Sequence, residues 1–130
     1  MSRGLRVMSN KPNPSILIVD DNEINLMLMV DVLEVIGITK IKTLNNGLEA
    51  VKEMKKCLNF DVILMDICMP IMDGYEASKQ IRHLGYRGQI IALTANEISK
   101  LNSEFLEAKM DGFILKPVDI NEVDKILRSV

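Results

Sequence analysis

The chain has 130 residues, of which 48% are hydrophobic and 26% are charged, proportions typical of one globular domain. Its formal net charge of −2 gives no electrostatic signature for nucleic-acid binding, and no apolar run reaches the roughly 20 residues of a membrane span. The start of the chain lacks a signal-peptide core. We therefore expect a cytoplasmic domain that contacts neither nucleic acid nor membrane, with Cys57 and Cys68 as free thiols.

Residues 1–14 are polar and interrupted by prolines, and we interpret them as a flexible tail or linker before one domain at 15–130. Short, continuous apolar runs then predict strands that are buried on both faces. These runs are Ile16–Val19, Val62–Met65, Ile90–Leu93 and Phe113–Leu115. A weaker run at Ile38–Leu44 alternates apolar and polar residues, which favours a strand near the edge of the sheet.

Between these runs, apolar residues recur at helical spacing. The expected helices are Glu23–Ile36, Gly47–Cys57, Tyr75–Leu84, Glu97–Lys109 and Ile120–Ser129. Strands that alternate with helices predict an α/β fold, in which helices cover both faces of a parallel sheet.

Polar residues follow the strong strands at the point where each strand ends. They are Asp20 and Asp21 after the first, Asp66 after the next, then Thr94 and Lys116. Taken singly, such an aspartate is often a helix N-cap and such a lysine a surface charge. Because parallel strands bring their carboxyl ends to one edge of the sheet, all five residues together predict one site.

Three carboxylates at one edge repel one another unless a cation lies between them. Hard oxygen ligands favour Mg²⁺, with Mn²⁺ as a further candidate. An aspartate is also able to form a covalent acyl phosphate, whose charge the cation, Lys116 and the Thr94 hydroxyl would neutralise. No residue remains as an evident base for an external substrate, so the chemistry points to phosphorylation of the chain's own carboxylate.

Four stretches resemble the receiver domain of two-component response regulators over essentially all of 15–130: Ile16–Asn22, Asp61–Gly74, Ala92–Asn96 and Phe113–Pro117. The resemblance implies a single flavodoxin-like, doubly wound sheet of five parallel strands in the order 2-1-3-4-5, with five helices. It also implies a phosphorylated signalling switch, whose own catalysis is limited to self-phosphorylation and autodephosphorylation.

The same resemblance assigns roles to the acidic residues. Asp66 would be the phosphoacceptor and a ligand of Mg²⁺, with Asp21 as a direct metal ligand and Asp20 as a ligand through water. The backbone carbonyl of Cys68 would complete the protein ligands, while we expect its side chain to be a small buried hydrophobe.

Further residues would contact the phosphoryl group or respond to it. Thr94 and Lys116 would bind its oxygens, and Thr94 and Phe113 would form the switch that changes the face of the fourth and fifth helices. A static core phenylalanine is the alternative for Phe113. The resemblance also predicts a cis peptide before Pro117.

The first helix has more apolar residues than one buried face requires. We expect the sheet to be covered by Leu28, Val32, Leu33 and Ile36. The remaining apolar residues near the active edge would face solvent and receive a histidine kinase or histidine phosphotransfer domain: Leu26, Met27 and Val30. Contact with a flanking segment, or with a second copy in a homodimer, is the alternative.

Competing functions remain open from the residues alone. One is a degenerate receiver that binds partners without phosphorylation. A phosphatase of the haloacid dehalogenase type is disfavoured, because Asn22 stands where that class has a second aspartate. A flavin-binding module is disfavoured by Asp20 and Asp21 in the first loop. Within the receiver interpretation, we favour the receiver of a hybrid histidine kinase in a phosphorelay over a stand-alone regulator.

Overall fold

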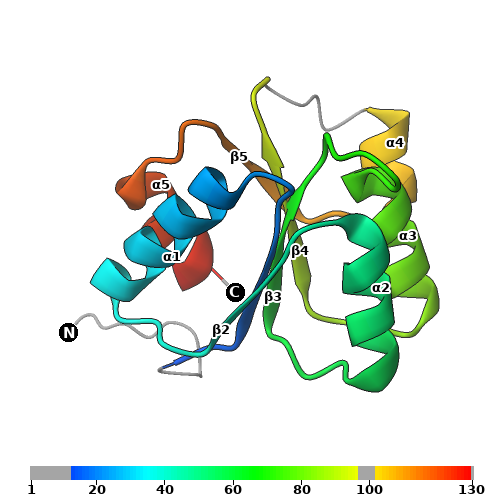
Figure 1. The fold of residues 1–130 in the computed structure, drawn as a ribbon, viewed down its shortest axis with the longest axis horizontal. Coiled ribbons are helices and arrows are strands. Elements are labelled where there is room, and N and C mark those ends of the chain that lie inside the picture. The colour runs from blue at the N-terminus through cyan, green and yellow to red at the C-terminus, as the bar shows by residue number, and fades with distance from the viewer. Residues whose placement is uncertain (1–12, 97–101, 130) are drawn as a thin grey trace.

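Five parallel strands form one sheet in the order β2-β1-β3-β4-β5 in the computed structural model, which describes residues 13–96 and 102–129 (Figure 1). The strands are β1 (Ile16–Val19), β2 (Ile41–Leu44), β3 (Val62–Asp66), β4 (Gln89–Thr94) and β5 (Gly112–Leu115). Every neighbouring pair is parallel. The doubly wound, flavodoxin-like sheet expected from the sequence is confirmed.

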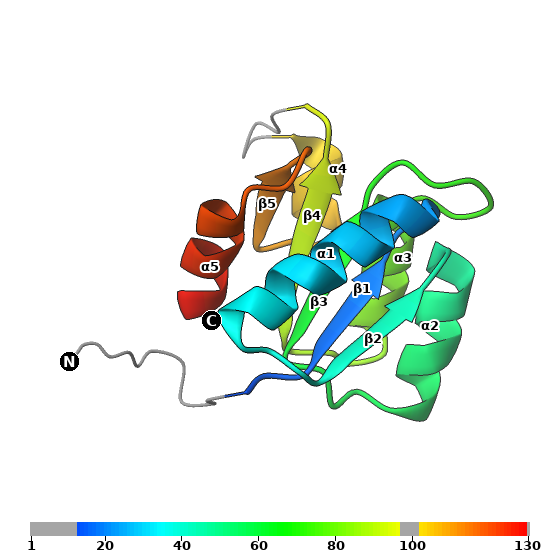
Figure 2. The same cartoon turned by 60° about the vertical axis from the view of Figure 1, so that its left-hand side comes forward.

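Five helices connect the strands, and α1 and α5 cover one face of the sheet while α2, α3 and α4 cover the other (Figures 1 and 2). They are α1 (Glu23–Ile36), α2 (Gly47–Lys56), α3 (Gly74–His83), α4 (Ser103–Glu107) and α5 (Ile120–Arg128). Each begins after an Asn or Asp side chain that accepts a backbone hydrogen bond, which fixes the start of the helix. Of these helices, none has the length and apolarity needed to cross a membrane.

The elements differ from the sequence prediction mainly at their ends. The strand expected from Ile38 begins only at Ile41, because Ile38 completes the C-terminal cap of α1. Gly37 adopts a left-handed φ of 105° there, and Ile38 donates its N–H to the carbonyl of Leu33. The helix expected at Glu97–Lys109 is observed at Ser103–Glu107, since the Asn102 side chain caps its start; residues 97–101 lie outside the described part of the chain.

The predicted tail at residues 1–14 stays a prediction, because the structure describes only its last two residues. Residues 1–12 lie outside the described range. The Asn13 side chain, however, donates to the hydroxyl of Thr39 and accepts from the Thr39 N–H, at 2.8 and 3.0 Å. Asn13 thus contacts the segment that precedes β2.

Alternate side chains of each strand enter two separate apolar clusters, one on each face of the sheet. Leu17 and Val19 of β1 pack against the side of α2 and α3, whereas Ile16 and Ile18 pack against α1 and α5. All four are fully buried, which accounts for the continuous apolar run in the sequence.

Arg82 of α3 connects several segments near the starts of the strands, at the edge of the sheet away from the acidic residues. Its guanidinium donates to the carbonyls of Gly88 and Lys109 and pairs with Asp111 at 2.8 Å. Asp111 also accepts the N–H of Ile90 at the start of β4. This network holds the starts of β4 and β5 to the end of α3.

Gly74 brings the start of α3 against the end of β3. A Cβ atom at this position would collide with the carbonyl oxygen of Asp66 and would lie 2.9 Å from Cα of Ile67. The helix is therefore able to approach Asp66 only because residue 74 has no side chain.

We predict that Gly74→Ala lowers the free energy of unfolding by about 2 kcal/mol or more, measured by urea denaturation, because the clash is with backbone that cannot rotate away. Gly112→Ala is the matched control, since its nearest atom would be the Ile91 side chain at 3.6 Å. A stabilising effect of Gly74→Ala, as expected for an unhindered helix position, would contradict this prediction.

Candidate functional site

Polar residues that end four of the strands lie at the carboxyl edge of the sheet. Asp20 follows β1, Asp66 is the last residue of β3, Thr94 ends β4 and Lys116 follows β5. The Lys116 ammonium lies 3.2 Å from Oδ2 of Asp20 and 3.1 Å from Oδ1 of Asp66. The convergence predicted from the sequence is confirmed for Asp20, Asp66 and Lys116, whereas Thr94 ends its strand at the same edge and bonds within its own loop.

The three carboxylates form one cluster. One oxygen from each of Asp20, Asp21 and Asp66 lies within 4.8 Å of the others. Asp20 and Asp66 are buried, whereas Asp21 is exposed. The backbone N–H of Asn22 donates to Oδ1 of Asp20, and that of Cys68 donates to Oδ1 of Asp66, which orients both carboxylates.

The charges of this cluster are incompletely balanced. Burial, followed by the negative charge of Asp20, raises the pKa of Asp66 to about 6, although Lys116 acts in the opposite direction. Burial alone would lower the pKa of Lys116, but its hydrogen bond and charge interaction with Asp66 raise that pKa above the usual value. Lys116 is therefore a permanent cation at neutral pH, and Asp66 carries an energetic cost when ionised.

A divalent cation fits this cluster. Oδ2 of Asp20 is buried and takes no hydrogen bond from the described residues, and the Lys116 ammonium is its ion-pair partner. Three carboxylates with one ammonium leave excess negative charge, and hard oxygen donors suit Mg²⁺ or Mn²⁺. On Asp66, Lys116 and the Cys68 N–H both reach Oδ1, and no described hydrogen bond or ion pair reaches Oδ2.

Thr94 is oriented by its own loop. Its hydroxyl donates to the carbonyl of Asn96 at 2.9 Å and accepts the Asn96 N–H at 3.2 Å. Phe113 lies opposite Ala92 in the register of β4 and β5, is half-buried, and borders an open groove of about 440 Å³ beside α5. Both residues thus have a partly open environment.

Two further predictions concern the loops. The Lys116–Pro117 peptide is cis, as expected from the sequence. The Cys68 side chain is exposed, so the prediction that it is a small buried hydrophobe is wrong. Its backbone faces Asp66 while its side chain points away from the core, which alternation along an extended loop allows.

The family model of the response regulator receiver domain matches residues 16–128. The chain belongs to the response regulator receiver family. Two-component system protein A of Emericella nidulans is 38% identical to the receiver over 117 residues, which are 89% of this chain and 17% of that protein. The receiver thus spans a small part of this curated relative.

Solved receivers share the fold. The receiver domain of the histidine kinase CKI1 from Arabidopsis thaliana, complexed with Mg²⁺ and BeF₃⁻, is 30% identical with a TM-score of 0.80, covering 88% of this chain and 87% of that one. The Ssk1 receiver of Saccharomyces cerevisiae, crystallised with the histidine phosphotransfer protein Ypd1, gives a TM-score of 0.78 at 29% identity; the match covers 93% of this chain and 88% of that one.

The face of α1 that the receiver buries differs from the prediction. Leu26 is buried, with 9% of its surface exposed, so its assignment to a solvent-facing docking surface is wrong. Leu28, expected to cover the sheet, is 51% exposed. Met27 is exposed as predicted, at 66%, and Val30 is half-buried against the core. Because α1 is apolar on all sides, its periodicity did not identify the stripe that packs on the sheet.

Sequence reasoning also missed Ile71, in the loop between β3 and α3. Its φ is 74°, and the N–H of Met72 donates to the carbonyl of Pro70 across it, which makes a tight three-residue turn. A β-branched residue in this region is strained, and the Ile71 side chain is 79% exposed. No sequence signal marks the turn, since glycine is the residue usually found in it.

We predict that the metal-free receiver loses stability between about pH 4 and pH 6 through Asp66. In this interval the folded state holds a proton that the unfolded state has released, so the free energy of unfolding falls as pH rises. Asp66→Asn removes this fall and should be more stable than wild type above pH 6, by about 1–2 kcal/mol after allowance for screening.

Urea denaturation of both proteins in the presence of a chelator, at pH 4.5 and pH 7.5, measures this difference. A gap between wild type and Asp66→Asn that is equal at the two pH values would contradict the assignment of a raised pKa to Asp66.

Proposed function

We propose that this receiver is a phosphorylation switch, which accepts a phosphoryl group from a phosphohistidine donor onto Asp66. The observation that carries the proposal is that Oδ1 of Asp66 is held by Lys116 and the Cys68 N–H, while the described contacts leave Oδ2 as the nucleophile. Asp66 also lies at the carboxyl edge of the sheet, where parallel α/β folds bind ligands.

The transfer forms a bond between Oδ2 of Asp66 and phosphorus and breaks the bond between phosphorus and the donor imidazole nitrogen. Lys116 is positioned to pair with a phosphoryl oxygen, because its ammonium is already 3.1 Å from the accepting carboxylate. The Thr94 hydroxyl supplies a further hydrogen bond once it leaves Asn96. Phosphoryl transfer needs chiefly such positioning and charge neutralisation.

We assign Mg²⁺ to the acidic cluster, with Asp21, Asp66 and the Cys68 carbonyl as ligands and Asp20 as a ligand through water. The buried Oδ2 of Asp20 and the spacing of the three carboxylates support this assignment. When bound, the cation neutralises charge on the carboxylates and on the phosphoryl oxygens.

The switch would operate through Thr94 and Phe113. Movement of the Thr94 hydroxyl from Asn96 to the phosphoryl group would free space near β5, and half-buried Phe113 would rotate into it. Phe113 has no hydroxyl to bond in either orientation, so packing alone would set its preference. The changed face of α4 and α5 would then be recognised by an output partner.

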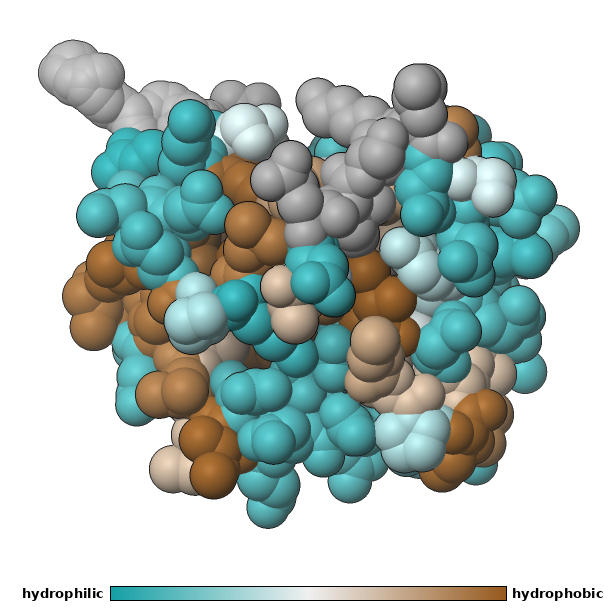
Figure 3. All heavy atoms as spheres, turned by 90° about the horizontal axis from the view of Figure 1, so that it is seen from above, coloured by the Kyte–Doolittle hydropathy of each residue, from teal (hydrophilic) through white to brown (hydrophobic). Residues whose placement is uncertain are grey.

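For the donor, we infer a histidine kinase or histidine phosphotransfer domain in a cytoplasmic phosphorelay. We place its contact on the exposed apolar surface at the start of α1, which consists of Ile24, Met27 and Leu28. Figure 3 looks down on the site edge and has apolar side chains on the α1 side, beside a hydrophilic centre. An apolar surface next to the nucleophile suits a partner that must bring its histidine to Asp66.

A degenerate receiver, which binds partners without phosphorylation, is the second candidate. Such a receiver would need neither an Asp66 carboxylate with one oxygen oriented by two donors nor a buried Asp20 oxygen that takes no hydrogen bond from the described residues. We infer further that this receiver belongs to a longer hybrid histidine kinase, as the curated relatives are much longer proteins.

We predict that acetyl phosphate with Mg²⁺ adds one phosphoryl group to the wild-type chain, measured by intact-protein mass spectrometry. Asp66→Asn should gain none, because it lacks the nucleophilic oxygen, and a chelator should prevent the gain in wild type. Asp124→Asn is the matched control, since this partly exposed carboxylate on α5 pairs with Arg128 away from the site. Mass gain in Asp66→Asn, or none in wild type, would refute the proposal and favour the degenerate receiver.

We predict that Met27→Glu slows phosphotransfer from the cognate histidine phosphotransfer domain roughly fivefold or more, while phosphorylation by acetyl phosphate stays normal. Val35→Glu is the matched control, because Val35 is 75% exposed on the same helix but lies at the end far from the site. Rates come from transfer of labelled phosphate. Equal rates for Met27→Glu and wild type would refute this docking surface.

A further inference from the structure

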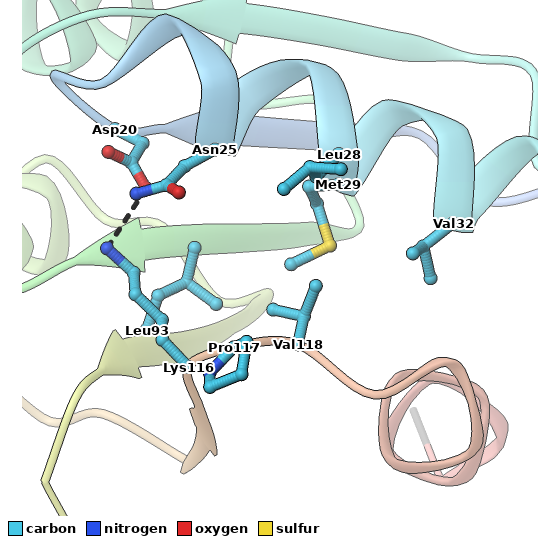
Figure 4. Close-up of a pocket in the computed structure, with 9 residues that line it drawn as sticks. All are labelled: Asp20, Asn25, Leu28, Met29, Val32, Leu93, Lys116, Pro117 and Val118. Carbon is cyan, nitrogen blue, oxygen red and sulfur yellow. Dashed lines mark ion pairs between the residues drawn. The ribbon is translucent and has the colours of Figure 1, made fainter.

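A cavity of about 150 Å³ lies between α1, the end of β4 and the loop from β5 to α5 (Figure 4). Its walls are apolar and come from three segments. They are formed by Leu28, Met29, Val32, Leu93, Pro117 and Val118. Met29 and Leu93 are buried at its base, whereas Leu28 and Pro117 are exposed, so the cavity opens to solvent.

The polar end of the cavity is formed by Asp20, Asn25 and Lys116. Oδ2 of Asp20 is buried, takes no hydrogen bond from the described residues and lies 3.2 Å from the Lys116 ammonium. The side-chain amide of Asn25 makes no hydrogen bond within the described part of the chain. This end thus offers an acceptor whose described partner is the Lys116 ammonium, and a cation that has further protons to donate.

A cavity of this volume lined by apolar side chains holds a ring of the size of benzene. A hydroxyl on that ring would match the polar end, since its oxygen accepts from Lys116 and its proton goes to Oδ2 of Asp20. We propose that this cavity binds a small phenolic molecule, with the ring among the apolar walls and the hydroxyl at the Lys116–Asp20 pair. The ring and hydroxyl fill the volume, which favours a free molecule over a tyrosine of a partner protein.

Binding at this cavity would oppose phosphorylation, because the hydroxyl engages two groups of the phosphoacceptor site. This consequence rests on the proposed function, whereas the binding itself does not. By linkage, the phenol must weaken binding of a phosphoryl analogue by the same factor as the analogue weakens binding of the phenol.

Titration of the ¹³C-methyl-labelled protein with phenol and with benzene tests the site. We expect saturable shifts of the Met29, Val32 and Leu93 methyl signals, with affinity for phenol at least about fivefold higher than for benzene, owing to the hydroxyl contacts. Val32→Phe should fill the cavity and abolish the shifts. The control Val35→Phe adds the same ring to an exposed position of α1 that does not line the cavity, and should bind as wild type does.

Equal affinities for phenol and benzene would overturn the hydroxyl contacts, and this comparison needs only the wild-type protein. Shifts that persist in folded Val32→Phe would place the ligand elsewhere and overturn the site. Tighter binding of N-acetyltyrosinamide than of phenol would overturn the assignment to a free molecule and indicate a partner's tyrosine.

For the linkage, the affinity of the Mg²⁺-loaded protein for BeF₃⁻ is measured by ¹⁹F NMR with and without saturating phenol. We expect saturation to lower that affinity severalfold, and unchanged affinity would overturn the coupling. Absence of BeF₃⁻ binding without phenol would instead refute the proposed function, and the titration would still decide whether the cavity binds phenol.

Discussion

Asp20 and Asp66 place two buried carboxylates around the single ammonium of Lys116, at 3.2 and 3.1 Å. One positive charge balances only one of them, and Asp21 adds a third carboxylate within 4.8 Å. Burial, followed by the negative charge of Asp20, raises the pKa of Asp66 to about 6, and the excess negative charge favours binding of a further cation. A phosphoryl group on Asp66 would add further negative charge, so cation binding would favour the proposed phosphorylation and phosphorylation would favour cation binding.

The two edges of the sheet at which the strands begin and end differ in how their polar groups are paired. At the edge away from the site, Arg82 uses its guanidinium to hold backbone carbonyls and Asp111, so polar groups are paired. At the site edge, one oxygen of the Asp20 carboxylate takes no hydrogen bond from the described residues, and Ile71 is held in a strained turn. The hydrogen bonds and ion pair of Arg82 stabilise the fold. They offset the unfavourable free energy of the strained turn and of the buried carboxylate oxygen at the site edge.

Much of this fold was readable from the sequence, because buried parallel strands leave an unambiguous apolar run. Ile16–Val19 agreed in both bounds, as did the helix Glu23–Ile36. The meeting of Asp20, Asp66 and Lys116 also followed, since parallel direction brings strand ends together. These predictions depend on local pattern and topology alone.

Other features depend on contacts that no local pattern records. The collision that makes Gly74 necessary involves the Asp66 carbonyl, which only the packed structure brings near. The turn at Ile71 runs against the residue preference of its conformation. The start of α4 is set by the Asn102 cap, which the apolar spacing does not reveal.

The distribution of apolar residues around helix α1 explains why the prediction for Leu26 was wrong. It also explains why docking is proposed at this helix. A helix that is apolar on all sides is normally buried throughout, yet Met27 is 66% and Val35 is 75% exposed. The core needs only one stripe, which contains Leu26, Met29 and Leu33.

The apolar residues of α1 outside this stripe differ in their distance from the site. Met27 and Leu28 lie in the first half of the helix, which begins two residues after Asp21, and Leu28 also lines the cavity at Lys116. Val35 lies about two turns further along, in the second half of the helix and away from the acidic residues. Under the proposed docking, a partner that reaches Asp66 would cover Met27 and Leu28, whereas burial of Val35 would require a different contact. The two ends of α1 therefore allow docking at the site to be distinguished from general apolar association.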